Sequence, residues 1–64
     1  MNITLREKIE LEITKMKERV VQLDRHIAEY VNVGNLADAA INQIKRNTLT
    51  LVIDSFDEIL RNHK

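Results

Sequence analysis

The sequence predicts an all-α fold in which residues 1–64 form a single antiparallel hairpin of two helices. Three observations support this prediction. The chain has no proline and only one glycine, Gly34, whereas a strand-rich fold would need more turn residues. Apolar residues before Gly34 recur at alternating steps of four and three, which is the spacing of one helical face. The segments on the two sides of Gly34 are nearly equal in length, so a short hinge would fold one helix back along the other.

The first helix is expected over residues 4–31. It opens with a capping-box pattern, in which Thr4 caps the helix and Glu7 follows three residues later. A heptad seam of apolar residues then continues for three heptads, while charged residues occupy the other faces. The helix therefore has one narrow apolar stripe, as in a coiled coil. Its members are Ile9, Ile13, Met16, Val20, Leu23, Ile27 and Tyr30.

A hinge is expected at residues 32–35. Gly34 suits the left-handed backbone conformation that commonly ends a helix. Asn35 suits the N-cap of the next helix, and Asp38 would lie near the positive end of that helix's dipole.

The second helix, expected over residues 36–62, carries a wider apolar arc. A stripe begins at Ala37, Ile41 and Ile44 and continues on a rotated face. An arc of more than a third of the circumference contacts more than one neighbour. Residues 47–53 have the propensities of a strand, but a lone strand would have no partner, so we expect helix with room for a kink near Asn47. The rotated face is made of Leu49, Val52, Ile53, Phe56, Ile59 and Leu60.

A chain this short needs a further stabilising element. A domain of about 60 residues buries only about 60% of its unfolded surface, so a disulfide, a metal or a partner subunit usually completes it. The sequence has no cysteine, and His26 and His63 lie far apart with no ligand motif around them, so we expect no metal site and no cofactor. A homodimer of hairpins that forms a four-helix bundle is therefore expected. The expected interface residues are Ile13, Val20, Leu23, Ile27, Leu49, Val52, Ile53, Phe56 and Leu60.

The charge and hydropathy patterns restrict the possible partners and location. Ten acidic and ten basic residues leave no net charge, which argues against non-specific binding to nucleic acid. The N-terminal residues turn charged at once, without the apolar core of a signal peptide, and no apolar run approaches the roughly 20 residues that span a bilayer. We therefore expect a cytoplasmic protein with no membrane association.

A hairpin hinged at Gly34 would place residues near 21 opposite residues near 46. This register gathers Arg19, Arg25, Lys45 and Arg46 into a basic band at mid-bundle. One interpretation is an anion site for a nucleotide signal or structured RNA. The alternative is a solvated face stabilised by charge pairs along each helix. The lack of exposed aromatic residues argues against binding of single-stranded RNA.

Two resemblances bear on function. In outline the chain resembles the plasmid RNA-regulating Rop family, whose short hairpins of two equal helices dimerise into a bundle, although no RNA-contact residue can be matched. Residues 23–30 are similar to the helix motif of the small sporulation-phosphorelay phosphatases, and that resemblance implies a functional role for Asp24. Residues 20–22 depart from the motif, because they lack its leading serine and glutamate, and here the motif lies on the first helix rather than the second.

We expect a binding protein rather than an enzyme. General acid–base catalysis needs carboxyl groups in a cleft, and a helical hairpin offers none of its own. The leading interpretation is a small regulatory protein, of a size common in bacteria, phages and plasmids, that binds a partner protein as a helical-bundle oligomer. The sequence does not identify that partner.

Overall fold

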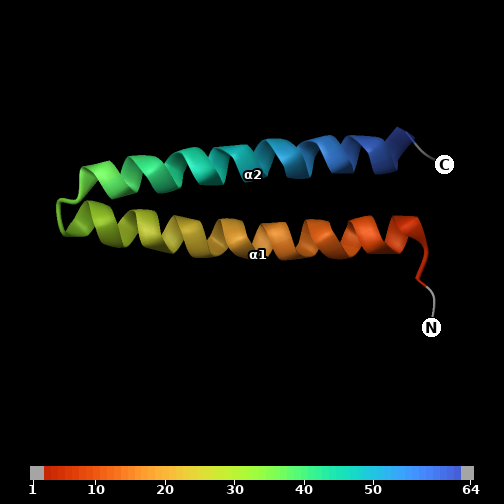
Figure 1. The fold of residues 1–64 in the computed structure, drawn as a ribbon, viewed down its shortest axis with the longest axis horizontal. Helices are drawn as coiled ribbons and strands as arrows, with labels where there is room; N and C mark the ends of the chain where they lie inside the picture. Colours follow the sequence, from red (N-terminus) through yellow and green to blue (C-terminus); the bar gives the residue numbers. More distant parts are fainter. Residues whose placement is uncertain (1–2, 63–64) are drawn as a thin grey trace.

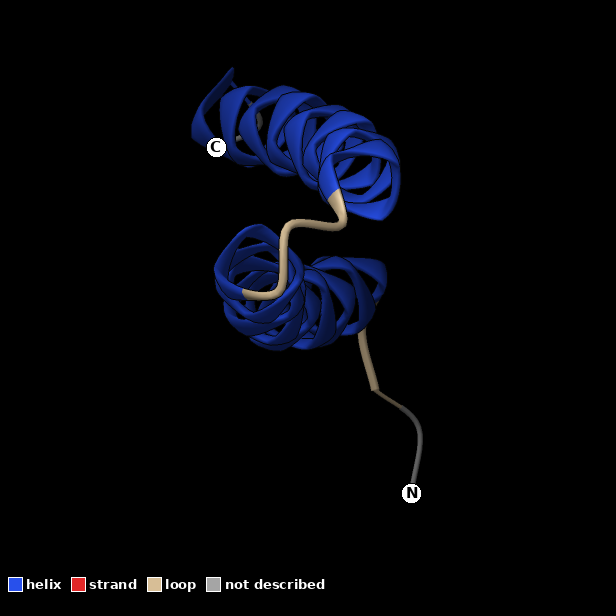
Figure 2. Ribbon diagram, turned by 90° about the vertical axis from the view of Figure 1, so that its left-hand side faces the viewer, coloured by secondary structure: helices blue, strands red, loops and turns tan. Residues whose placement is uncertain are grey.

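The computed structural model describes residues 3–62, and over this range the chain forms two helices joined by a tight turn (Figure 1). Helix α1 spans Leu5–Asn32 and helix α2 spans Leu36–Asn62. The helices lie side by side in both views and run antiparallel, so the start of α1 and the end of α2 lie at the same end of an elongated hairpin (Figures 1 and 2). The predicted all-α hairpin is confirmed, and no strand occurs between residues 3 and 62.

Helix α1 begins at the predicted cap. The Thr4 hydroxyl accepts a hydrogen bond from the backbone N–H of Glu7 at 3.1 Å and donates one to the Glu7 carboxylate at 3.2 Å. The first of these bonds satisfies one of the N–H groups that have no partner inside a helix, and Glu7 also lies at the positive end of the helix dipole.

The turn at Gly34 ends α1 in a Schellman motif. Gly34 has a φ of 77°, the left-handed conformation that the sequence predicted. The N–H of Asn35 donates to the Tyr30 carbonyl at 2.8 Å, and the N–H of Gly34 donates to the Val31 carbonyl at 3.1 Å. The Asn35 side chain then caps α2, because its carbonyl oxygen accepts from the N–H of Asp38 at 3.2 Å.

The predicted apolar seam of α1 is the surface that packs against α2. Its seven residues are buried or half-buried, and every other residue of α1 is exposed. Ile13 and Leu23 are buried most deeply, and Leu23 is only 1% exposed. A narrow stripe of this kind gives α1 one neighbour.

Helix α2 does not turn the apolar stripe of its first half toward α1. Near the turn, α1 is faced by Ala39, Asn42 and Arg46, which are buried or half-buried, whereas Ile41 and Ile44 are exposed. The stripe that begins at Ala37, Ile41 and Ile44 therefore lies outside the contact with α1. The narrow seam of α1 covers only one edge of the wide apolar arc of α2, and the small side chain of Ala39 allows close approach there.

The polar side chains on the inner face of α2 have partners within their own helix. The Asn42 amide donates to the Asp38 carbonyl at 2.8 Å, and the Thr50 hydroxyl donates to the Arg46 carbonyl at 3.0 Å. Helix α2 is continuous past Asn47, so residues 47–53 are helical, as expected.

Within the described residues, two polar contacts join the helices. Arg46 forms an ion pair with Asp24 at 2.7 Å, and a guanidinium nitrogen of Arg6 donates to the Leu60 carbonyl at 3.2 Å. These contacts bracket the predicted register, since residue 46 meets residue 24 instead of 21 and residue 60 meets residue 6 instead of 7. Neither helix, over the described part of the chain, is long and apolar enough to cross a membrane.

Candidate interaction surfaces

The side of α2 that faces away from α1 carries large apolar residues. Ile41, Ile44, Leu51 and Ile59 are exposed by 50%, 66%, 68% and 45%. Small or short side chains at Ala37, Thr48 and Ser55 share this side, and the series from 37 to 55 advances by alternating steps of four and three. We call these seven residues the outer face of α2. It is a second heptad seam, and nothing within residues 3–62 covers it.

The outer face of α2 carries almost no charge. Between residues 39 and 53 the only charged residues are Lys45 and Arg46, and Arg46 is paired with Asp24 of α1. The polar members of the face also have partners, since the hydroxyls of Thr48 and Ser55 donate to the carbonyls of Ile44 and Leu51 at 3.0 and 2.9 Å. An apolar surface packed against this face would therefore leave few polar groups without partners.

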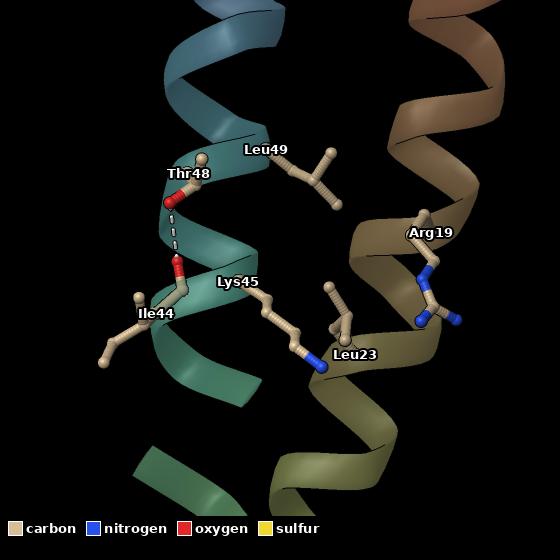
Figure 3. Close-up of a pocket in the computed structure, with 6 residues that line it drawn as sticks. All are labelled: Arg19, Leu23, Ile44, Lys45, Thr48 and Leu49. Carbon is tan, nitrogen blue, oxygen red and sulfur yellow. Dashed lines mark hydrogen bonds between the residues drawn. The ribbon is translucent and has the colours of Figure 1, made fainter. Parts of the chain in front are cut away.

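An open groove of about 400 Å³ runs beside the outer face, between the two helices. Figure 3 shows Leu23 of α1 and Leu49 of α2 between the helices, with Arg19 and Lys45 extending from the two sides. Ile44 points away from α1 in this view and links the groove to the outer face. The groove is lined by Arg19, Leu23, Ile44, Lys45, Thr48 and Leu49.

The structure brings together two members of the predicted basic band. Arg19 and Lys45 line the groove, where Arg19 also donates to the Gln22 side chain at 3.2 Å. Arg46 is held by Asp24 and does not line the groove, and Arg25 is exposed elsewhere on α1. Whether this band binds an anion stays a prediction.

The hairpin itself covers most of the predicted oligomer interface. Eight of its nine residues are buried or half-buried, and only Val52 is exposed, by 37%. The four large apolar residues of the outer face were not among the nine. The signal that could have found them is the second series of four-and-three steps, which begins at Ala37.

The described residues show no cluster of metal ligands. No group of three or more His, Cys, Asp or Glu residues among them could hold a metal ion. Asp24, the residue that the phosphatase resemblance singles out, is half-exposed and paired with Arg46. Over the same range, no buried side-chain nitrogen or oxygen lacks a hydrogen-bond partner.

Comparison with known proteins assigns no family to the chain. No family model, no curated protein and no solved structure matches it. Among the described residues, the outer face of α2 and the groove beside it are the features that bear on function.

Proposed function

We propose that the protein is a small, non-enzymatic regulatory protein of the cytoplasm, which acts by binding a partner protein as a helical-bundle oligomer. The outer face of α2 is the observation that carries this proposal. Contiguous apolar surface on a folded protein marks a site of interaction, whereas single exposed apolar residues do not. Here large apolar side chains follow one helical face for several turns.

The form of the surface favours a helical ligand. Residues at steps of three and four make the kind of stripe that packs into another helix or helical groove. The hairpin presents this stripe on a helix that is capped at Asn35 and held by contacts with α1. The groove between the helices is open and apolar, which suits packing better than it suits the enclosure of a reacting substrate.

The test is capture of a partner from the native host with paired variants. Tagged wild-type protein should enrich a specific protein, and Leu51→Glu should reduce its recovery by about tenfold or more, because an unpaired charge would enter an apolar contact. Val21→Glu is the matched control, since Val21 is 54% exposed on α1 between Lys17 and Arg25. Equal recovery with wild type and Leu51→Glu would contradict the proposal.

A second candidate function is binding of an anionic ligand, and the placement of Arg19 and Lys45 favours it. Both residues line one groove, and neither forms an ion pair within the described part of the chain. A guanidinium suits phosphate through bidentate hydrogen bonds, and copies of the site in an oligomer would raise the local positive potential. A nucleotide signal or structured RNA has the required phosphates.

Calorimetric titration with nucleotides and with structured RNA tests the second candidate. Binding should weaken between low and physiological salt and should be lost in the double variant Arg19→Gln, Lys45→Gln. Lys17→Gln, which removes an exposed cation from outside the groove, should bind as wild type does. The absence of binding at both salt concentrations, or binding that survives the double variant, would exclude this site.

A further inference from the structure

The hairpin exposes more surface than a compact protein of its size. Its accessible area is 5214 Å², whereas a compact monomer of 7.5 kDa exposes about 4,200 Å². The difference of about 1,000 Å² is close to the roughly 800 Å² that each partner contributes to a stable protein interface. One interface of ordinary size would bring the exposed area to that of a compact protein.

Only α2 offers a face on which such an interface could form. The exposed large apolar residues of α1 are scattered around the helix among charged residues and share no stripe: Leu5, Leu11, Val21 and Val31. A closed bundle, in which both helices line one core, would have to cover the groove and bury Arg19 and Lys45. Burial of charges without partners is unfavourable, so the contact falls on the outer face, which shares only Ile44 and Thr48 with the groove.

We propose that the outer face of α2 is covered by α2 of a second copy of this chain, antiparallel to the first, with both α1 helices on the outside. This inference rests on the proposed function, because it names the surface through which the oligomer forms, and the host protein then binds the assembled dimer rather than the outer face itself. The dimer is a layered arrangement of four helices, in which α2 has a neighbour on two opposite sides and α1 has one. One neighbour covers the narrow apolar stripe of α1, whereas the wider apolar arc of α2 needs two.

The outer face is complementary to itself when two copies run antiparallel. In a register that overlaps α2 along almost its whole length, Ile44 of one copy lies opposite Ser55 of the other. In the same register Leu51 lies opposite Thr48, so large side chains meet small ones in the middle of the contact, while Ile41 lies opposite Glu58 near its ends. The small residues thus accommodate the large ones of the second copy. A parallel pairing would instead set each large residue against its own copy and each small residue against another small one.

The charges and dipoles also favour the antiparallel arrangement. Lys45 of one copy would lie about 13 Å along the helix axis from Lys45 of the other, whereas parallel helices would place the two lysines side by side. Glu58, near the end of the face, would likewise meet its own copy only in the parallel dimer. The dipoles of antiparallel helices oppose each other, which is the favourable orientation.

Sedimentation equilibrium tests the assembly. Wild-type protein at micromolar concentration should sediment as a dimer, with twice the 7.5 kDa mass of the chain. Leu51→Glu should weaken the dimer by about a hundredfold or more in Kd, because it sets a charge against Thr48 of the second copy. Val21→Glu should remain dimeric. A helical wild-type protein that sediments at the mass of one chain would overturn the proposal.

Disulfide cross-linking tests the face and the direction, even if Leu51→Glu also loses helix. The natural chain has no cysteine, so Ile44→Cys and Ser55→Cys introduce the only thiols. An oxidised mixture of the two variants should form a mixed disulfide. Ile44→Cys alone should not, because its copies would lie about 16 Å apart along the axis, beyond disulfide reach.

Two results would overturn the arrangement. Efficient cross-linking of Ile44→Cys to itself would show a parallel pair, and a dimer whose mixed variants do not cross-link would use another face. The tests also separate this inference from the proposed function. If the protein is a monomer that still captures a host protein through α2, the proposed dimer is wrong and the proposal of partner binding stands. If α2 cross-links as a dimer but the protein captures no host protein, the proposed dimer is supported and the proposal of partner binding is wrong.

Discussion

Leu23 is the side chain whose truncation tests the packing of the hairpin most directly. It is 1% exposed and is the only large side chain fully buried among the described residues. It projects between the helices toward Leu49, at the floor of the groove (Figure 3). Leu23→Ala therefore removes the best-packed part of the contact between α1 and α2.

The size of the effect follows from what the substitution leaves behind. Leu23→Ala removes three carbon atoms, for which the lost transfer free energy is about 2.4 kcal/mol at about 0.8 kcal/mol for each group. A sealed cavity would add to this loss, but the groove lies beside Leu23 and allows water or neighbouring side chains to fill the space. We expect a decrease of about 2.5–3 kcal/mol in the free energy of unfolding.

Such a decrease is large for this chain. At the usual 0.05–0.15 kcal/mol per residue, 64 residues have a total stability of about 3–10 kcal/mol. Urea unfolding followed by circular dichroism measures the change, with all variants at one protein concentration because assembly also contributes to stability. Leu11→Ala is the matched control, since Leu11 is 49% exposed on the same helix, and it should change the stability by less than about 0.5 kcal/mol.

The result that would refute this reasoning is an equal effect of the two substitutions. If Leu23→Ala and Leu11→Ala both left the midpoint of unfolding within error of wild type, the seam of α1 would not be the stabilising contact. If both lowered it by about 2.5 kcal/mol, α1 would have a second partner on its outer side, contrary to the proposed dimer.

Two further predictions concern the turn and the ion pair between the helices. Gly34→Ala should lower the free energy of unfolding by about 1–2 kcal/mol, because φ is 77° at this position and an L side chain is strained there. No neighbouring atom lies within 4 Å of an added Cβ, so no steric clash adds to this loss. Gly34→Asn should lower it less, and an alanine variant as stable as wild type would show that the turn adopts another conformation. Asp24→Asn should lower the free energy of unfolding by no more than about 1 kcal/mol, since Asp24 and Arg46 are 50% and 34% exposed, and 1 M salt should remove most of the difference. A larger, salt-independent loss would assign Asp24 a role beyond the ion pair.

The parts of the fold that the sequence predicted correctly depend on neighbouring residues. The cap at Thr4, the left-handed Gly34 and the cap at Asn35 each use a side chain and a backbone group a few positions away. The seam of α1 was also predictable in full, because charged residues surround it and leave only one face that can be buried.

The candidate site was only partly predictable. The broad apolar arc of α2 indicated more than one neighbour, and part of that arc is exposed in the hairpin. Arg19 and Lys45 line the same groove, and Arg46 forms an ion pair with Asp24. Both arrangements depend on how the helices are rotated about their axes. A register estimated from the hinge predicts which residues lie at the same level along the hairpin. It does not predict on which side of the contact between the helices each residue lies.

The sequence by itself therefore determined two helices, their caps, the turn and the inner face of α1. Only the tertiary structure decided which edge of the α2 arc is buried. Ile53 and Leu49 lie toward α1, whereas Ile44 and Leu51 are exposed, although all four are equally apolar. Burial of either edge would remove similar apolar area from water, so the hydropathy pattern does not distinguish them. The choice depends on close packing, because Ala39 lets the helices approach near the turn and Asp24 binds Arg46 on one side.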